Sequence, residues 1–219
     1  MKLTPLHERL LADILDLGSP YPLVLTGGYA VQAHGLVERF SRDLDVATEN
    51  PAPMDEIVAA LTAGLTARGW RTTHVQTDPL SGRFLVTDPD TGEECEVDVL
   101  KEAFWAPPAQ TPYGPVLSLD DVIGTKVRAL ADRGTVRDLI DVRAASRHRS
   151  TADLESLGRR RAPDEFSLEN LRDRLTGADW YEDEDYAAYG LTSRQIEELK
   201  TWALAWAQDL GARIHDENA

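Results

Sequence analysis

Two aspartates in one short stretch give the first indication of chemistry. Asp43 and Asp45 belong to the alternating segment Asp43-Leu44-Asp45-Val46, a pattern typical of a β-strand. Because side chains two apart in a strand point the same way, both carboxylates are expected on one face, with Leu44 and Val46 in the core. Neighbouring carboxylates repel each other, and a hard divalent cation such as Mg²⁺ between them removes the repulsion. An acidic edge strand is the alternative interpretation.

The segment upstream of this pair is suited to hold a phosphate. A short apolar strand, 23–25, runs into Thr26-Gly27-Gly28 and directly into a helix of small residues that ends near Gly35. Such a turn presents backbone N–H groups and a helix N-terminus to an anion, and glycines let the anion approach closely. A Gly-Gly turn followed by Asp-x-Asp therefore predicts a nucleoside triphosphate and its metal at the edge of one small sheet.

A third carboxylate lies on another predicted strand. In Glu96-Val97-Asp98-Val99 the two acids share one face and the two valines share the other. Asp98 is predicted to join Asp43 and Asp45 at the metal and to accept a proton from an attacking hydroxyl. The alternative is a charged residue on the open face of a hairpin.

The elements that must position these residues follow from periodicity. Helical patterns cover 6–17 and 54–68, and strand patterns cover 43–47, 70–77, 82–87 and 94–100, the last two joined by the turn 88–92. Residues 1–105 are therefore predicted to form an α/β module around a mixed sheet.

Four prolines separate this module from the rest of the chain. Pro107, Pro108, Pro112 and Pro115 predict that 106–116 is a linker or crossover loop without regular structure. Residues 117–219 have a helical pattern, with helices expected from Ser118 and at 135–146, 165–175 and 192–210. Trp202 and Trp206 are expected to anchor a core or an interface.

Composition and charge exclude several classes of protein. With no run of eighteen apolar residues and an acidic N-terminal segment, the chain predicts neither a membrane span nor a secretory signal, and a cytoplasmic protein is expected. Cys95 is the only cysteine, which excludes an internal disulfide and a multi-thiolate zinc site. The net charge of -15 argues against coating nucleic acid by bulk attraction. Residues 126–161 nevertheless hold ten Lys or Arg against five Asp or Glu, so a local basic surface is predicted.

These motifs resemble those of the DNA polymerase β superfamily of nucleotidyltransferases. Within it, Gly27-Gly28-Tyr29-Ala30 followed by Arg39-Phe40-Ser41-Arg42-Asp43-Leu44-Asp45 looks most like the AbiEii and MenT group of nucleotidyltransferase toxins. That group carries a Lys helix and then an Arg-Asp-x-x-Asp helix, and Lys126 precedes Arg137-Asp138-Leu139-Ile140-Asp141 here. The resemblance covers about residues 20–145, with Gly28 where Ser is frequent. It implies an α+β fold, a polymerase β-like core of mixed sheet and helices followed by a C-terminal helical domain that completes the active site.

The resemblance also implies roles for individual residues. Asp43 and Asp45 would bind Mg²⁺, or Mn²⁺ in its place, and Asp141 would be a further catalytic acid, with Asp138 a weaker candidate. The residues that would bind the nucleotide are Gly27, Gly28, Ser41, Lys126 and Arg137. The alternative for Lys126, Arg137, Asp138 and Asp141 is a set of salt bridges that joins two helices.

The function implied by the resemblance is transfer of a nucleotide from a nucleoside triphosphate (NTP) to an acceptor hydroxyl, with release of pyrophosphate. The acceptor would be RNA, in particular a tRNA 3′ end, and the protein would be the toxin partner of a cognate antitoxin protein. The arginines predicted to bind the phosphate backbone of the RNA are Arg143, Arg147, Arg149, Arg159, Arg160 and Arg161. Two alternatives stay open: nucleotidylation of a cationic small molecule such as an aminoglycoside or lincosamide, which the net charge favours, and a fold that only binds a partner. Intact Asp43, Asp45, Asp98 and Lys126 argue against the second.

Overall fold

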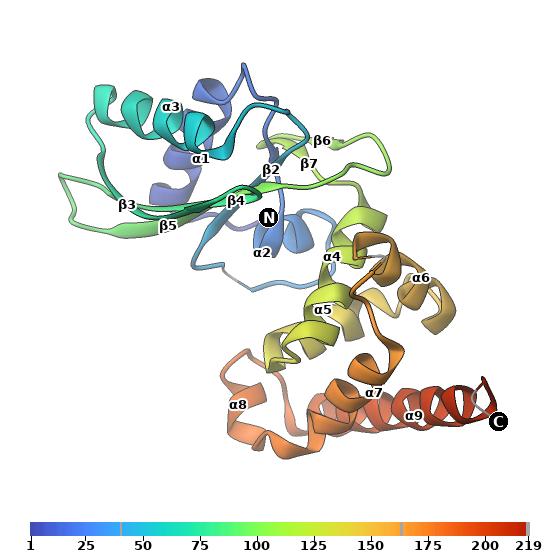
Figure 1. Ribbon diagram of the computed structural model, residues 1–219. Helices are drawn as coiled ribbons and strands as arrows, with labels where there is room; N and C mark the ends of the chain where they lie inside the picture. Colours follow the sequence, from blue (N-terminus) through green and yellow to red (C-terminus); the bar gives the residue numbers. More distant parts are fainter. Residues whose placement is uncertain (40, 163, 218–219) are drawn as a thin grey trace. The chain divides into compact units, whose positions relative to one another are not determined.

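The computed structural model describes residues 1–39, 41–162 and 164–217 (Figure 1). The chain divides into two units, Met1–Val122 and Ile123–Ala219. This division falls inside one helix, α4 (Leu119–Asp132).

The first unit is built around a seven-stranded mixed sheet. In the order β3-β4-β5-β2-β1-β7-β6, its strands are β3 (Arg71–Asp78), β4 (Ser81–Thr87), β5 (Glu94–Lys101), β2 (Leu44–Thr48), β1 (Val24–Leu25), β7 (Gly114–Val116) and β6 (Ala109–Thr111). β2 runs parallel to β5 and antiparallel to β1. The predicted α+β class and mixed sheet are therefore confirmed.

Strand alternation separates a buried face of this sheet from a polar one. Phe84 on β4 pairs with Val97 on β5, and both side chains are fully buried. Arg83 pairs with Asp98 and points to the other face, because successive side chains of a strand alternate. Because apolar and charged residues alternate along β4 and β5, Arg83 and Asp98 lie together on the polar side of the sheet.

Helices cover the apolar face. Figure 1 shows α1 (Pro5–Leu17) and α3 (Met54–Ala67) on one side of the sheet and the short α2 (Gly27–Ala33) on the other. A Cβ added to Gly82 of β4 would lie 2.3 Å from a Val58 methyl carbon, so α3 packs directly against the backbone there. Leu10 and Leu61, from α1 and α3, are fully buried.

The prediction that 106–116 has no regular structure is wrong. β6 and β7 form a hairpin in this segment, and β7 continues the sheet by pairing in parallel with β1. Three of the four prolines lie outside the strands, and only Pro115 lies inside one, opposite Gln110. Antiparallel pairs alternate between bonded and non-bonded positions, so a single proline is tolerated in a short strand near a sheet edge.

The second unit is helical, as predicted. It holds the rest of α4, and α5 (Val136–Ala145), α6 (Thr151–Arg161), α7 (Leu168–Thr176), the 3-10 helix η1 (Gly177–Trp180), α8 (Asp183–Ala187) and α9 (Ser193–Glu217). The predicted helices correspond to α4, α5, α7 and α9. The sequence interpretation missed α6, although Ser150 and Asp153 form the capping box that begins it.

A buried glutamate ties α6 to α9 in this unit. The carboxylate of Glu155 accepts hydrogen bonds from Trp206 Nε1 at 2.9 Å and from Arg213 at 2.6 and 3.0 Å. Trp206 is 3% exposed, so its predicted role as a core anchor is confirmed. Within the described part of the chain, no helix is long and apolar enough to span a membrane.

The packing of the sheet predicts a large loss of stability when Phe84 becomes alanine. Since Phe84 is fully buried, Phe84→Ala is expected to lower the free energy of unfolding by about 3–5 kcal/mol, as measured by urea denaturation. Leu80→Ala is the control, because that side chain is 69% exposed, and it is expected to change stability by less than about 0.5 kcal/mol. Equal losses for the two variants would contradict this account of the core.

Candidate active site

The glycine turn packs directly against the second aspartate. The backbone N–H of Thr26 donates to the carbonyl of Asp45 at 2.9 Å, where β1 and β2 pair. Gly27 follows with a φ of 59°, and a Cβ added to it would lie 1.8 Å from Asp45 Oδ2. Only glycine fits here, since a side chain would meet the carboxylate and would also be strained at this φ.

The acidic residues share the polar face of the sheet. Asp45 on β2 is the register partner of Asp98 on β5, and parallel partners point to the same side. The guanidinium of Arg83 holds Asp98 with two hydrogen bonds of 2.7 Å and lies 3.1 Å from Glu96. Asp43 immediately precedes β2, and its charge helps to raise the pKa of Arg83. The strands therefore bring Asp43, Asp45 and Asp98 to one face.

The donor chemistry fits a metal held by two carboxylates. Among the described residues, no group of three His, Cys, Asp or Glu side chains is placed to hold a metal. Mg²⁺ commonly takes only one or two protein carboxylates and completes its octahedron with water and phosphate oxygens. Asp43 and Asp45 supply two carboxylates from one short segment, and Asp98 accepts two hydrogen bonds from Arg83. Asp98 as a third ligand stays a prediction.

Electrostatic effects on the neighbouring groups support a concentration of negative charge. Burial raises the pKa of the Glu96 carboxyl, Arg83 opposes this, and Asp98, Asp43 and Asp45 raise it further. Burial, with help from Asp43, raises the pKa of Cys95 to about 12, so this thiol stays protonated at neutral pH. Cys95 is 1% exposed and is a core residue.

A buried pair of rings supports the segment that leads to Asp43. The hydroxyl of Tyr29, on α2, donates to the carbonyl of Ser41 at 3.2 Å and also contacts Nδ1 of His7, on α1. A carbonyl oxygen only accepts, so the hydroxyl proton lies toward Ser41 and His7 Nδ1 donates to Tyr29. Ser41 is itself buried. Phe40, quoted in the family motif, lies outside the described residues.

Sequence reasoning missed Arg83 and His7 as parts of this site. Arg83 could have been found, because the predicted hairpin of 82–87 and 94–100 places it opposite Asp98. The role of His7 depends on a contact between α1 and α2, which no local pattern reveals. Tyr29 itself is 0% exposed and packs in the core.

In the second unit, Lys126 and Asp141 pair with each other. Their charged atoms are 3.3 Å apart, and the side chains are 8% and 0% exposed. This ion pair joins α4 to α5, which is what the salt-bridge alternative expected. Contact between Lys126 and nucleotide phosphates, and a catalytic role for Asp141, stay predictions.

Asp138 has a clear structural role at the start of α5. It accepts two 2.8 Å hydrogen bonds from Arg133 and forms the capping box with Thr135. Burial by itself would raise the pKa of Asp138, but the hydrogen bonds from Arg133 and Thr135 outweigh it and the pKa lies below the usual value. Arg137, a predicted nucleotide ligand, is half-buried on the same helix.

The candidate RNA-binding arginines are placed differently from one another. Arg143 stacks over Trp202, with 5.4 Å from its Cζ to the ring centre, and donates to Ser146. Arg147, Arg159 and Arg160 are exposed, whereas Arg149 and Arg161 are half-buried. The run 159–161 occupies the last turn of α6, where positive charges interact favourably with the helix dipole.

Gly27 provides a test of the close approach to Asp45. Gly27→Ala and Gly35→Ala both place a side chain at a positive φ, 59° and 69°, which costs about 1–2 kcal/mol. At Gly35 a Cβ would meet no atom of the described residues within 4 Å, so only Gly27→Ala adds a clash with Asp45. We therefore expect the larger loss of unfolding free energy in urea for Gly27→Ala. Equal losses would mean that the clash is relieved without cost.

The lowered pKa of Asp138 predicts a pH-dependent contribution to stability. At pH 7 we expect Asp138→Asn to lower the unfolding free energy by about 2–3 kcal/mol, because the charged hydrogen bonds and the cap are lost. A lowered folded pKa means that this contribution is present above the unfolded pKa of about 3.9 and disappears as the pH falls through the folded value. Urea denaturation at pH 7 and pH 3 should therefore show the difference shrinking in acid.

Asp153 is the matched control for this measurement. It closes the same kind of capping box with Ser150 on α6 but is exposed, and no arginine among the described residues is shown to donate two hydrogen bonds to it as Arg133 does to Asp138. Asp153→Asn is expected to cost less than Asp138→Asn at pH 7. A loss at Asp138 that stays constant down to pH 3 would contradict the electrostatic explanation.

Solved structures that share this fold include two that cover most of the chain. JHP933 from Helicobacter pylori is 19% identical, with a TM-score of 0.58 over 99% of this chain and 98% of that one. MenT4, a nucleotidyltransferase toxin from Mycobacterium tuberculosis, is 18% identical, with a TM-score of 0.57 over 92% of this chain and 82% of that one. A search of the curated proteins found no match to the sequence.

The sequence itself gives the family. Residues 9–209 match the family described as "Nucleotidyl transferase AbiEii toxin, Type IV TA system". This match runs through both units and includes the glycine turn, the acidic strands and the helices that carry Lys126 and Asp141. The chain therefore belongs to the AbiEii family of nucleotidyltransferase toxins and is a nucleotidyltransferase.

Proposed function

We propose that this protein is a Mg²⁺-dependent toxin that transfers a nucleoside monophosphate from an NTP to the 3′ end of a tRNA in the cytoplasm. A cognate antitoxin protein is the expected partner in its toxin–antitoxin system. Family membership supports nucleotidyl transfer, and the metal, the acceptor and the site residues are the proposed parts.

The observation that carries the proposal is the packing of Gly27 against the carboxylate of Asp45. This contact brings the glycine turn, suited to phosphate, next to an acidic residue, suited to a metal. Asp43 and Asp45 would hold Mg²⁺, and the backbone at Gly27 and Gly28 would approach the triphosphate. When bound, the metal would neutralise charge on the phosphate oxygens during in-line displacement of pyrophosphate.

Other residues have supporting roles in this proposal. Asp98, held by Arg83 on the same face as Asp45, would accept the proton of the attacking hydroxyl. The Tyr29 hydroxyl would fix the backbone at Ser41, two residues before Asp43. For Lys126 and Arg137 the family motif supports contact with the nucleotide, and for Asp141 it supports a catalytic role. The exposed Arg147, Arg159 and Arg160 would bind the RNA backbone.

A cationic small molecule is the second candidate acceptor. The net charge of -15 favours a positively charged substrate over an RNA, since like charges oppose the approach of a polyanion. The basic segment 126–161 favours RNA instead, because it concentrates positive charge in an otherwise acidic chain. An acceptor assay distinguishes the two candidates.

The test is label transfer from each radioactive NTP, with Mg²⁺, to total tRNA or to a panel of aminoglycosides and lincosamides. We expect label on tRNA, lost on treatment with EDTA and restored by added Mg²⁺. Asp45→Asn should lower the rate at least about 100-fold while leaving unfolding in urea nearly unchanged, because it removes metal-binding charge but keeps the shape of the side chain.

The control is Asp90→Asn, which changes an exposed carboxylate in the 88–92 turn and should transfer label at the normal rate. Label on a drug instead of tRNA would replace the proposed acceptor and keep the enzyme. Undiminished transfer by Asp45→Asn would overturn the assignment of the metal site.

A further inference from the structure

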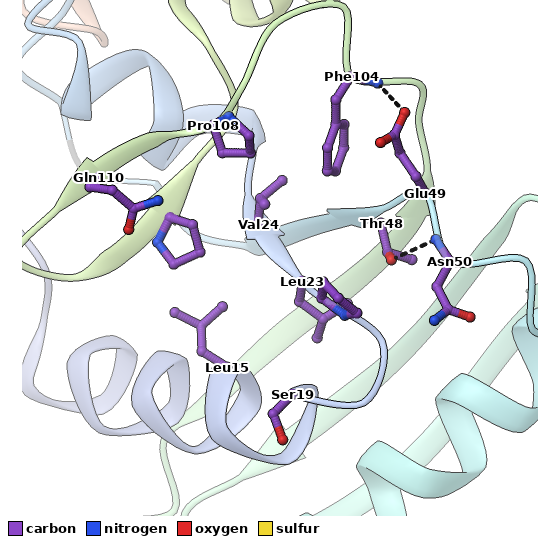
Figure 2. A pocket seen from close by; sticks show the side chains of 12 residues that line it. Leu15, Ser19, Leu23, Val24, Thr48, Glu49, Asn50, Phe104, Pro108 and Gln110 are labelled. Carbon is purple, nitrogen blue, oxygen red and sulfur yellow. Dashed lines mark hydrogen bonds between the residues drawn. The ribbon is translucent and has the colours of Figure 1, made fainter.

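A separate, mostly apolar cavity of about 560 Å³ lies in the first unit. Figure 2 shows it between the end of α1, the 19–23 loop, the end of β2 and the segment that leads into β6. Its apolar lining comes chiefly from Leu15, Leu23, Val24, Phe104, Pro108 and Pro115. The volume is within the range of about 300–1,000 Å³ that is typical of small-molecule sites.

This cavity lies at the opposite end of β2 from the acidic pair. Asp43 precedes the first residue of the strand, whereas Thr48 at its last position lines the cavity. A strand rises about 3.3 Å per residue, so the ends of this five-residue strand are roughly 13 Å apart. None of the proposed nucleotide or metal ligands lines the cavity.

The walls are held in place without a ligand. Prolines 22, 108 and 115 supply rigid backbone with no N–H group to satisfy. The backbone N–H of Phe104 donates to Glu49 Oε1 at 2.8 Å, which fixes the segment that carries the ring (Figure 2). Thr48 Oγ1 accepts from the backbone N–H of Asn50 at 3.0 Å on the same side. A pre-formed site of this kind loses little entropy on binding.

The polar groups of the lining favour a positively charged ligand. Glu49 is exposed, and among residues that the structure describes nothing hydrogen-bonds to its second oxygen, Oε2. Lys101, the register partner of Thr48, directs its ammonium to the carbonyls of Asn50 and Ala52 instead. Glu49 therefore offers an acceptor and a negative charge beside an apolar cavity, on a chain whose net charge is -15.

The neighbouring sheet edge argues for a small molecule over an added peptide strand. β6 is the end strand of the sheet and would be the template for such an addition. It has only three residues, and Pro108 and Pro112 stand directly on either side of it. Prolines and short length protect an edge from strand pairing, so the cavity is the accessible feature here.

We propose that this cavity binds a small amphipathic amine, with its apolar body between Phe104 and the Leu15, Leu23 and Val24 side chains and its ammonium at Glu49. The site is separate from the proposed transferase site, and the proposal does not depend on which acceptor the enzyme uses.

Phenethylamine, an aromatic ring on a short cationic chain, is the probe. We expect saturable shifts of the Leu15, Leu23 and Val24 methyl resonances in NMR titrations of the whole chain, with a dissociation constant on the order of 1 mM for so small a ligand. The neutral analogue 2-phenylethanol should bind about threefold more weakly, and 3-phenylpropionate, an anion, more weakly still. Shifts centred on Leu44 would instead indicate binding at the acidic pair and would overturn the assignment.

Two variants separate charge from shape. Glu49→Gln keeps an oxygen for the Phe104 N–H but removes the charge, so it should weaken the amine about threefold and leave the alcohol unchanged. Phe104→Ala should weaken both ligands. Glu38→Gln, at an acid whose side chain is 87% exposed and outside the lining, is the control and should bind as the unchanged protein does. Equal affinity for the amine and the anion, or saturable binding of an apolar peptide without any binding of the amine, would overturn the proposal.

Discussion

The close approach of Gly27 to Asp45 is the constraint on which the rest of the acidic site depends. It follows from the pairing of β1 with β2, in which the Thr26 N–H donates to the Asp45 carbonyl. Because these strands are neighbours, the glycine turn after β1 lies next to the Asp45 carboxylate. Leu44 and Val46 are fully buried on the opposite face, the face on which α3 packs against Gly82. Burial of those side chains fixes the register, and a shift by one residue would turn both aspartates into the core. The hydrophobic core therefore orients the acidic pair.

Charge balance on the polar face distinguishes Asp98 from the other two acids. Arg83 forms ion pairs with both Asp98 and Glu96, so these two acids have a protein counter-charge beside them. The charges of Asp43 and Asp45 still reach Glu96 and Cys95, whose pKa values they help to raise. A divalent cation at the pair would remove this repulsion with the few protein ligands that Mg²⁺ needs. At Asp98 a metal would compete with the two hydrogen bonds from Arg83, and its role as a third ligand stays a prediction.

Local patterns predicted the features that depend on local geometry. Alternation located β2, β4 and β5, and the hairpin register that follows from it already pairs Arg83 with Asp98. The same reasoning was wrong for 106–116, because four prolines suggested irregular structure where only Pro115 enters a strand. It could not find the His7–Tyr29–Ser41 contacts, since these join segments that no periodicity relates. For Lys126 and Asp141 the motif suggested roles in the reaction, whereas in the structure the two side chains form an ion pair with each other.

The buried pair of Lys126 and Asp141 limits what either residue can do alone. Removing one partner of such a pair leaves an uncompensated buried charge, and loss of activity in a single variant would then report unfolding as much as catalysis. Asp138 shares the difficulty, since it is buried, pairs with Arg133 and also caps α5 together with Thr135. Asp45 is different, because it lies on the polar face of a strand whose other side carries the core, and neutralising it exposes no apolar surface. The function of the acidic pair can therefore be separated from its contribution to folding, whereas that of the Lys126–Asp141 pair needs both residues changed together, so that no single charge is left buried.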